Sequence, residues 1–420
     1  MGKRLHLIVV MAVLLSAGSM MAPRTTMAQE SDRQTQVGLP VPGVCVEGTL
    51  PHGALSMICV PASGWNGSLV LWGHGYTAFN VPLDFQHMEL PDGTLISDLI
   101  QRLGFAFATT SYRQNGLAIL EGVEDMRELI AAFRQSHGAP HRTYMTGASE
   151  GGIISTMLLE QSPELVSGAL AMCGPIGSFR DQISHYGDFR VLFDYFFPGV
   201  LPGSPINIPT YVIDNWESTY APAIRQALAA NPSAAAQLIK TSKAAIDPQD
   251  PSSVETTAMT LLWYSVFATN DGSAKFGGNP YDNRSRIYFG SNNDFRLNLR
   301  VARFSAAAAA VQALKAYETS GNVRRPLIVM HTSGDQLIPI WHQVLYTLKA
   351  RISGQGLLTP VPILRYGHCN FTATEMVGAF GLLVLQVTGS ALADAPAIDT
   401  EQSARDFQVV RQQVEQSSAR

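Results

Sequence analysis

Apolar residues between positions 44 and 173 occur alternately in short unbroken runs and in longer runs with helical spacing. Ser68–Trp72, Phe105–Ser111 and Val166–Cys173 are short and apolar, which is typical of strands buried on both faces. Between them, Leu120–Phe133 places its apolar side chains on one helical face and stops before Gly138 and Pro140. Strands that alternate with helices of this length predict βαβ units and a mostly parallel central sheet.

The same alternation returns near the C-terminus, after position 321. Two more buried strands and two helices are predicted there: Pro326–His331, Ile338–Ile352, Val361–Tyr366 and Phe371–Val387. In the first of these helices the spacing predicts that Trp341, Leu345 and Leu348 face inward. At the other end of the pattern, Val44–Val60 predicts a hairpin that turns at Pro51-His52-Gly53.

The alternation fails between about Gly174 and Gly321. Prolines are frequent there, and helical runs such as Ala223–Ala230 and Ser305–Ala316 are separated by irregular segments. We interpret this stretch as a largely helical cap inserted into the sheet domain. A separate binding domain is the alternative, but the sheet pattern resumes afterwards. The aromatic clusters of this stretch fit the lining of an apolar substrate site and the core of the cap equally well; they are Phe193, Tyr195, Phe196, Phe197, Trp216, Trp263 and Tyr264.

The N-terminal segment has the pattern of a secretory signal peptide. Lys3 and Arg4 precede an apolar run, Leu5–Met21, and Thr26-Met27-Ala28 fits a cleavage site. An uncleaved membrane anchor is the alternative. We therefore expect a secreted or periplasmic protein with no stable membrane insertion. The predicted organisation is a signal peptide at 1–28, an α/β core at 29–173 and 322–397, a helical cap at 174–321 and a polar C-terminal tail at 398–420.

Composition narrows the choice of partners. Charged residues make up 15% of the chain, below the usual quarter, and the net charge is −4. No basic field for nucleic acid is present. There is also no two-histidine helix, C-x-x-C pair, calcium loop or glycine-rich phosphate loop. We expect a small-molecule or polymer substrate, no nucleic-acid partner, no metal and no cofactor; the oligomeric state stays open.

The four cysteines form an even set, which favours disulfide bonds in an exported chain. Cys45 and Cys59 flank the predicted hairpin, so we expect them to pair, which leaves Cys173 to pair with Cys369. Four buried free thiols are the alternative.

The motif with the most chemical content is Gly147-Ala148-Ser149-Glu150-Gly151-Gly152. It comes after a strand-like run, Thr143–Thr146, and precedes a helical one, Ile153–Gln161. A serine on such a sharp turn exposes its hydroxyl at the edge of the sheet. To act as a nucleophile it needs an imidazole that takes its proton and a carboxylate that orients the imidazole. Asp335 and His368 lie in loops directly after two later predicted strands.

The order of these residues and their three loop positions resemble the α/β-hydrolase fold over roughly Val44–Cys173 and Pro326–Val387. The resemblance implies that Ser149 is the nucleophile, Asp335 the orienting acid and His368 the general base. It also implies an oxyanion hole made by backbone amides, here those of Tyr76 and Glu150. The reaction expected from such a site is hydrolysis of carboxylic esters through an acyl-enzyme.

Several alternatives stay open at this point. Asp335 alone fits the cap of the helix that begins nearby. His331 and His342 are other candidate bases, although a buried strand and a helix interior favour structural roles for them. His185, in the cap, is a weak candidate for substrate contact. The alternative activity is that of a serine peptidase or amidase of the prolyl-oligopeptidase or aminopeptidase kind, and a binding protein on an inactive hydrolase scaffold is the third possibility.

Overall fold

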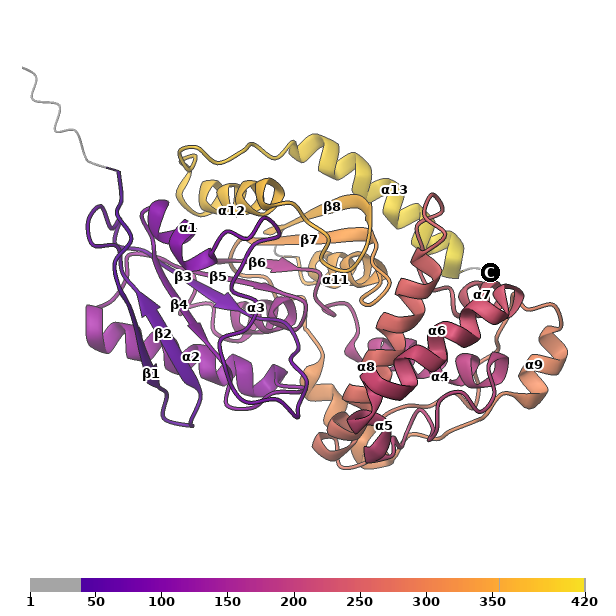
Figure 1. Cartoon of the computed structure of the whole chain (residues 1–420). Coiled ribbons are helices and arrows are strands. Elements are labelled where there is room, and N and C mark those ends of the chain that lie inside the picture. The colour runs from indigo at the N-terminus through magenta and orange to yellow at the C-terminus, as the bar shows by residue number, and fades with distance from the viewer. Residues whose placement is uncertain (1–38, 355, 419–420) are drawn as a thin grey trace, which may run out of the picture. The chain divides into compact units, whose positions relative to one another are not determined.

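Eight strands form one mixed sheet in the computed structural model, which describes residues 39–354 and 356–418. The predicted signal peptide lies outside these residues. The strands are β1 (Cys45–Thr49), β2 (Leu55–Cys59), β3 (Leu69–Gly73), β4 (Ala106–Thr110), β5 (Thr143–Ala148), β6 (Gly168–Met172), β7 (Leu327–Gly334) and β8 (Leu358–Tyr366). Their order across the sheet is β1-β2-β4-β3-β5-β6-β7-β8 (Figure 1). β2 pairs antiparallel with both of its neighbours, β1 and β4, and the other neighbouring strands pair in parallel.

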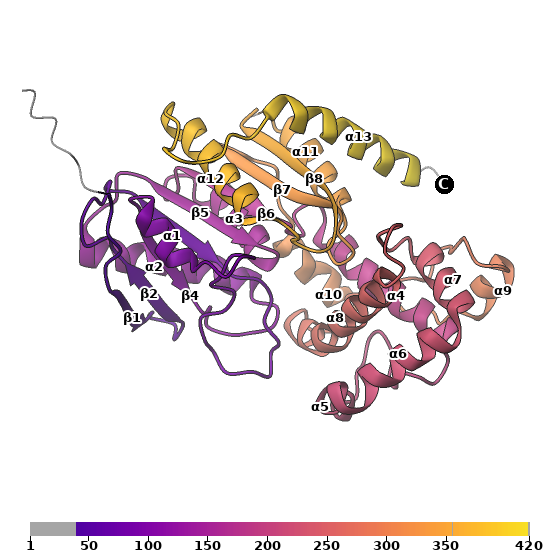
Figure 2. The ribbon, with the colours of Figure 1, turned by 45° about the horizontal axis from the view of Figure 1, so that its top comes forward.

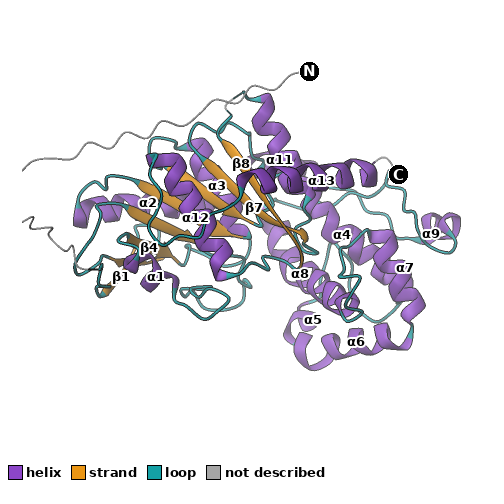
Figure 3. Ribbon diagram, turned by 90° about the horizontal axis from the view of Figure 1, so that it is seen from above, coloured by secondary structure: helices purple, strands orange, loops and turns teal. Residues whose placement is uncertain are grey.

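Helices cover both faces of this sheet (Figure 3). They are α1 (Ile96–Arg102), α2 (Ile119–His137), α3 (Glu150–Gln161), α11 (Trp341–Ile352), α12 (Ala373–Thr388) and α13 (Thr400–Ser418). Side chains alternate along each strand, so Leu69 and Leu71 of β3 pack with α2 and α3, whereas Val70 and Trp72 pack with α1 and α12. Every residue of β3 is buried because both faces are covered.

The predicted fold class, an α/β-hydrolase fold with a mostly parallel sheet, is confirmed by this strand order and pairing. The prediction for the inner face of α11 was wrong, because Leu348 is 54% exposed. The buried side of that helix carries polar side chains instead, such as His342 and Gln343. Gln343 donates from Nε2 to the carbonyl of Val329 in β7, so the helix packs by satisfying backbone groups as well as by apolar contact.

The segment between β6 and β7 is helical and builds an apolar core of its own. Its elements gather at the end of the sheet where the parallel strands finish (Figures 1 and 2). Phe193 and Trp216 are buried in that core, as are Leu337 and Ile338 from the loop after β7. The elements are α4 (Phe179–Phe196), α5 (Thr210–Asp214), η1 (Trp216–Tyr220), α6 (Ala221–Ala230), α7 (Pro232–Ser242), α8 (Ser253–Lys275), α9 (Asp294–Arg300), α10 (Ala308–Ala313) and η2 (Leu314–Tyr317).

The long helix α8 connects this inserted segment to three loops of the sheet domain. The hydroxyl of Tyr76, after β3, donates to the carbonyl of Phe267 at 3.2 Å. The backbone N–H of Leu117, after β4, donates to Asp271 at 2.7 Å. At the end of β8, the hydroxyl of Tyr366 lies 2.8 Å from the hydroxyl of Thr257. These contacts fix α8 over the carboxyl ends of the strands.

The segment predicted as a polar C-terminal tail contains the helix α13. It packs against β8 and α11 and buries Phe407 and Val410. None of the helices in the described part of the chain is both long enough and apolar enough to cross a membrane.

Glycines allow β5, α3 and β3 to approach closely. A Cβ on Gly151 would lie 2.0 Å from the carbonyl oxygen of Gly73, and one on Gly147 would lie 2.4 Å from the carbonyl oxygen of Gly151. A Cβ on Gly152 would meet the carbonyl oxygen of Met172 at 2.6 Å. All of these obstacles are backbone atoms, which cannot rotate away. The glycines of the serine turn are therefore required by the packing of α3 between two strands.

We expect Gly151→Ala to destabilise the protein by about 1–3 kcal/mol or more, since an added methyl group would force the backbones of α3 and β3 apart. Gly272→Ala in α8 is the matched control. Its new Cβ would meet nothing closer than 3.4 Å, and an alanine in a helix interior is favoured over glycine by about 0.8–1 kcal/mol. Urea unfolding of both variants measures the difference. Equal stability of the two would contradict the packing argument.

Candidate active site

Ser149 occupies the single residue between β5 and α3, and its backbone has φ 57° and ψ −118°. A positive φ is costly for a residue with a side chain, so the turn persists only because its surroundings hold it. The backbone N–H of Ser149 donates to the carbonyl of Met172 at the end of β6, 2.9 Å away. This geometry is the sharp strand-to-helix turn that the sequence pattern predicts, with the hydroxyl at the edge of the sheet.

The structure brings the three predicted catalytic side chains together. His368 Nε2 lies 3.0 Å from Ser149 Oγ, and His368 Nδ1 lies 2.8 Å from Asp335 Oδ2. They come from loops after β5, β7 and β8, and 219 residues separate the serine from the histidine. Since Nδ1 bonds a carboxylate, it carries the proton, which leaves Nε2 free to accept one from the hydroxyl.

Asp335 is buried, and each of its carboxylate oxygens has a separate task. Oδ1 accepts hydrogen bonds from the backbone N–H groups of Leu337 and Ile338, at 2.9 and 2.8 Å. Oδ2 accepts from His368. Asp335 therefore does cap the turn that leads to α11, as the alternative interpretation suggested, and orients the imidazole as well.

The two histidines beside Asp335 favour its ionised form. Burial alone would raise the pKa of this carboxyl group, but the hydrogen-bonded imidazole of His368 and the nearby ring of His331 outweigh burial and hold the pKa far below its usual value. His331 Nε2 donates to the carbonyl of Ile338 and lies 3.5 Å from Asp335 Oδ2. His331 is thus a support for Asp335 and does not contact Ser149. Its position four residues before the aspartate is the only sequence signal for this role.

Both predicted disulfide bonds are present, and one of them contacts the imidazole. Cys45 pairs with Cys59 across the β1–β2 hairpin, and Cys173 pairs with Cys369. Cys369 Sγ lies 3.3 Å from His368 Nε2. Cys173 and Cys369 both have a positive φ, of 44° and 49°, so the bond joins two sharp turns at the ends of β6 and β8. It uses both sulfur atoms and leaves no thiolate beside the histidine.

The loop after β3, predicted to supply part of the oxyanion hole, passes beside the serine. A Cβ on Gly75 would lie 3.4 Å from the Cβ of Ser149, so the backbone of this loop runs close beside the serine. His74 fixes the loop by stacking on Tyr112 at 4.0 Å and by bonding the carbonyl of Gly75. The use of the amides of Tyr76 and Glu150 as oxyanion donors stays a prediction. Glu150 is the first residue of α3, where a backbone N–H has no acceptor within the helix.

Of the two remaining candidate histidines, His342 is buried and His185 is half-buried. His342 accepts from the backbone N–H of Gly177 and bonds the side chain of Gln182. His185, predicted as a weak candidate for substrate contact, instead donates from Nε2 to the backbone carbonyl of Gln336. Burial lowers the pKa of His185, so the ring stays neutral and supports the loop beside Asp335.

A cleft of about 510 Å³ opens beside His368, between the loop after β8 and helix α8. Thr256, Thr260 and Tyr264, spaced four residues apart on one face of α8, form its far wall, and Gln336 and Phe371 contribute to the near wall. Among the described residues that line it, none is Asp, Glu, Lys or Arg. Sequence reasoning missed Gln336 and the two threonines; the four-residue spacing along α8 was the available signal for the threonines.

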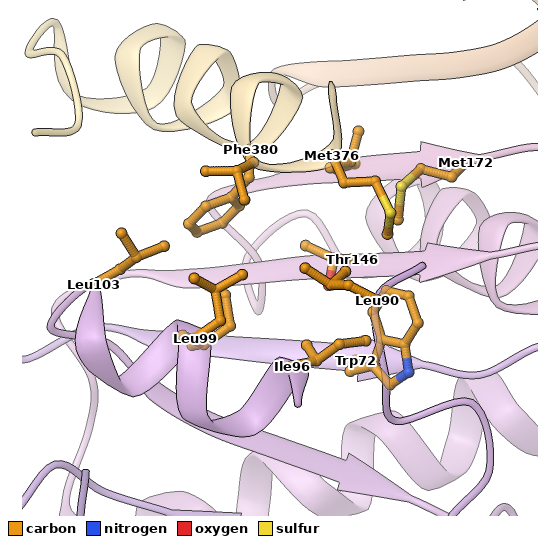
Figure 4. Close-up of a pocket in the computed structure, with 12 residues that line it drawn as sticks. Trp72, Leu90, Ile96, Leu99, Leu103, Thr146, Met172, Met376 and Phe380 are labelled. Atoms are coloured by element: carbon orange, nitrogen blue, oxygen red, sulfur yellow. The ribbon is translucent and has the colours of Figure 1, made fainter. Parts of the chain in front are cut away.

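A second cavity lies on one face of the sheet, between α1 and α12 (Figure 4). Trp72, Leu99, Met172 and Phe380 are among its lining residues, which are nearly all apolar. Its volume is about 40 Å³, room for little more than one or two water-sized groups. It is a packing void of the core and too small for a substrate.

Comparisons with known proteins add little beyond the fold. No protein-family model and no curated protein matches the sequence. Among solved structures, the acylaminoacyl peptidase of Pyrococcus horikoshii is similar with a TM-score of 0.44 and 12% identity over 88% of this chain and 45% of that chain. The Pyrococcus furiosus esterase Pf2001 is similar with a TM-score of 0.41 and 10% identity over 88% of this chain and 89% of that chain. The rice cell wall degrading esterase LipA of Xanthomonas oryzae has a TM-score of 0.41 and 14% identity over 82% of this chain and 86% of that chain. This chain thus spans less than half the length of the peptidase.

We expect the bond between Cys173 and Cys369 to hold His368 in register, so replacing both cysteines by serine should lower kcat by about tenfold or more, because small displacements of a catalytic group are costly. The double serine variant at Cys45 and Cys59 is the control, since that bond lies in the hairpin at the sheet edge. Kinetics are measured at a temperature where both variants are folded. An unchanged kcat in the variant without Cys173 and Cys369 would show that the disulfide bond is not needed to position His368.

We expect the folded protein to lose stability at alkaline pH because the buried side chain of Glu150 ionises there. Burial raises the pKa of this carboxyl group to about 8, against the opposing influence of a hydrogen bond from Ala118 and the charge of Lys275. The folded chain thus retains a proton that the unfolded chain releases from about pH 4.5. Protonated Glu150 therefore stabilises the folded protein fully below about pH 4.5, and this contribution to the free energy of unfolding is lost as the pH rises through 8.

Glu150→Gln keeps an oxygen for Ala118 N–H but cannot ionise. Thermal unfolding should show equal midpoints for the variant and the wild type near pH 4, and a midpoint at pH 9 that is higher in the variant by at least about 2 °C. Parallel pH profiles for the two proteins would rule out a titrating Glu150.

Proposed function

We propose that this protein is an exported serine hydrolase, secreted or periplasmic, that cleaves carboxylic esters through an acyl-enzyme. The observation that carries the proposal is the unbroken hydrogen-bonded path from Ser149 Oγ through His368 to Asp335 beside an open cleft. A structural serine has no need of an oriented imidazole and a buried carboxylate.

The geometry supports acylation of Ser149 by the ester. His368 Nε2 takes the hydroxyl proton as Ser149 Oγ attacks the ester carbonyl carbon, and the imidazolium that forms stays hydrogen-bonded to the ionised Asp335. The carbonyl oxygen becomes an oxyanion, which the amides of Tyr76 and Glu150 would stabilise at a typical contribution of about 3 kcal/mol each. Collapse of the tetrahedral adduct expels the alcohol, which takes the proton from Nε2.

Deacylation repeats the same steps with water in place of Ser149. Water loses a proton to His368 Nε2, attacks the acyl carbon, and the carboxylic acid leaves as Ser149 regains its proton. The depressed pKa of Asp335 serves both halves of the reaction, because the carboxylate must stay charged while the imidazole is protonated.

The cleft favours esters over the substrates of an exopeptidase. Capture of an N-terminal ammonium group needs carboxylates, and none of the described residues that line the cleft carries one. The carboxylate of Glu150 is buried and accepts a hydrogen bond from the backbone N–H of Ala118. Glu217 lies in η1 and does not line the cleft.

Export and the absence of a nucleic-acid partner belong to the same proposal. Two disulfide bonds fit a protein that works in an oxidising compartment. The net charge of −4 supports a neutral substrate or a polymer ester in preference to nucleic acid.

Reaction with a fluorophosphonate probe tests the nucleophile. We expect rapid labelling of the wild type, none of Ser149→Ala, and labelling slowed by at least about 10³-fold in His368→Ala, because the hydroxyl is inert without its base. Labelling of Ser149→Ala at the wild-type rate would place the nucleophile elsewhere.

A substrate pair then separates the two activities. 4-Nitrophenyl acetate and amino-acid 4-nitroanilides are compared after division of each kcat/KM by its uncatalysed rate. We expect the ester to give the larger ratio. A larger ratio for the nitroanilides would reject the ester proposal in favour of a peptidase or amidase.

A further inference from the structure

Gln336 has a buried amide that the protein leaves without a partner. The residue is 5% exposed, and its side-chain Oε1 has no hydrogen-bond partner among the described residues. An unsatisfied buried polar group costs about 1–3 kcal/mol, so a ligand that donates a hydrogen bond to this oxygen would recover part of that cost. Gln336 lines the cleft and comes directly after Asp335.

The backbone around Gln336 holds this amide in place. His185 Nε2 donates to the backbone carbonyl of Gln336 at 3.0 Å, and Asp335 bonds the next two residues, Leu337 and Ile338. The side chain therefore starts from a fixed point on the wall of the cleft. It offers a carbonyl acceptor and an NH₂ donor, with no charge.

The opposite wall also offers mainly hydrogen-bond acceptors. Thr260 Oγ1 donates its proton to the carbonyl of Thr256 at 2.7 Å, and Thr256 Oγ1 donates to the carbonyl of Ser252 at 3.3 Å. With their protons used in this way, the two hydroxyl oxygens face other partners as acceptors. These oxygens suit a ligand that brings several hydrogen-bond donors, and no Asp, Glu, Lys or Arg among the described lining residues is there to pair with a charge. Hydroxyl groups have this chemistry.

The position of the cleft indicates which part of the ester it holds. The leaving alcohol receives its proton from His368 Nε2, so its oxygen must lie next to that atom. The cleft is lined by Gly367–Phe371 around the histidine and by none of the residues of the oxyanion loop, 73–77. The alcohol side of the substrate thus enters this cleft. Tyr264 and Phe371 add ring surfaces against which the C–H face of a sugar can pack.

We propose that the cleft between Gln336 and the face of α8 formed by Thr256, Thr260 and Tyr264 binds an uncharged polyhydroxyl alcohol, and that the substrates are esters of sugars or similar polyols. This inference rests on the ester hydrolysis proposed above and specifies its substrate class. Gln336 is the residue that discriminates a hydroxylated alcohol from an apolar one of the same size.

The test compares two acetates with the same acyl group, methyl 6-O-acetyl-glucopyranoside and cyclohexylmethyl acetate. We expect the wild type to have the higher kcat/KM for the sugar acetate. In Gln336→Leu the sugar-to-cyclohexyl ratio should fall about tenfold, mainly through the KM for the sugar ester, as one uncharged hydrogen bond is lost. The ratio of the two kcat/KM values does not depend on the fraction of active protein, because that fraction affects both values equally. Partial misfolding of a variant therefore does not obscure the result.

Gln343→Leu is the matched control. Gln343 is also buried with an unpartnered Oε1, but its Nε2 bonds Val329 and it does not line the cleft. This variant should keep the wild-type ratio. Equal ratios in Gln336→Leu and the wild type, or a wild-type preference for the cyclohexyl ester, would overturn the inference while 4-nitrophenyl acetate is still hydrolysed. Failure to hydrolyse any ester, 4-nitrophenyl acetate included, would overturn the proposed function and this inference together.

Discussion

The site depends on the hydrogen bonds made by the buried carboxylate of Asp335. An ionised carboxylate in the interior is costly unless each oxygen is satisfied, and here one oxygen binds two backbone amides while the other binds His368. The loop after β7 can therefore adopt only a conformation that serves both oxygens. Because Leu337 and Ile338 of that loop also pack into the core of the inserted helices, Asp335 orients the imidazole of His368 and holds the residues that join the loop to those helices.

The parallel sheet brings residues that are far apart in the sequence close together at one edge. β5, β6, β7 and β8 are neighbours and run in one direction, so the loops after them emerge at one edge although they lie far apart in the chain. Backbone strain accumulates at this edge, with positive φ at Ser149, Cys173 and Cys369. The disulfide, the glycine contacts of α3 and the hydrogen bond from Thr332 to the carbonyl of Gly367 hold these turns together. The rigid core thus maintains a geometry that an isolated loop would not keep.

Periodicity and loop position were enough to predict the parallel sheet, the order of its strands along the chain and the three side chains that converge. Contacts that depend on the packing of one element on another could not be predicted in this way. Leu348 fitted an inward position by spacing, yet α11 turns polar residues to the interior because backbone groups there need partners. His185 carried no signal that separated substrate contact from support of the loop at Gln336. Three of the seven aromatics of the inserted segment are buried in its core and the other four pack against that core; Tyr264 is the one of the seven that lines the cleft.

Helix α8 is attached at three points around the cleft, and these attachments hold one wall of the cleft in place. It is bonded to the loop after β3 through Tyr76, to the loop after β4 through Asp271, and to the end of β8 through Thr257. Three attachments around the rim leave α8 little freedom to swing, and the hydroxyl-bearing face of the helix is therefore held at a fixed distance from His368. A preformed cleft loses little entropy when a ligand binds. The proposed selectivity depends on a polar group already in place more than on closure around a ligand, because Gln336 Oε1 is buried beside Asp335 and has no partner among the described residues.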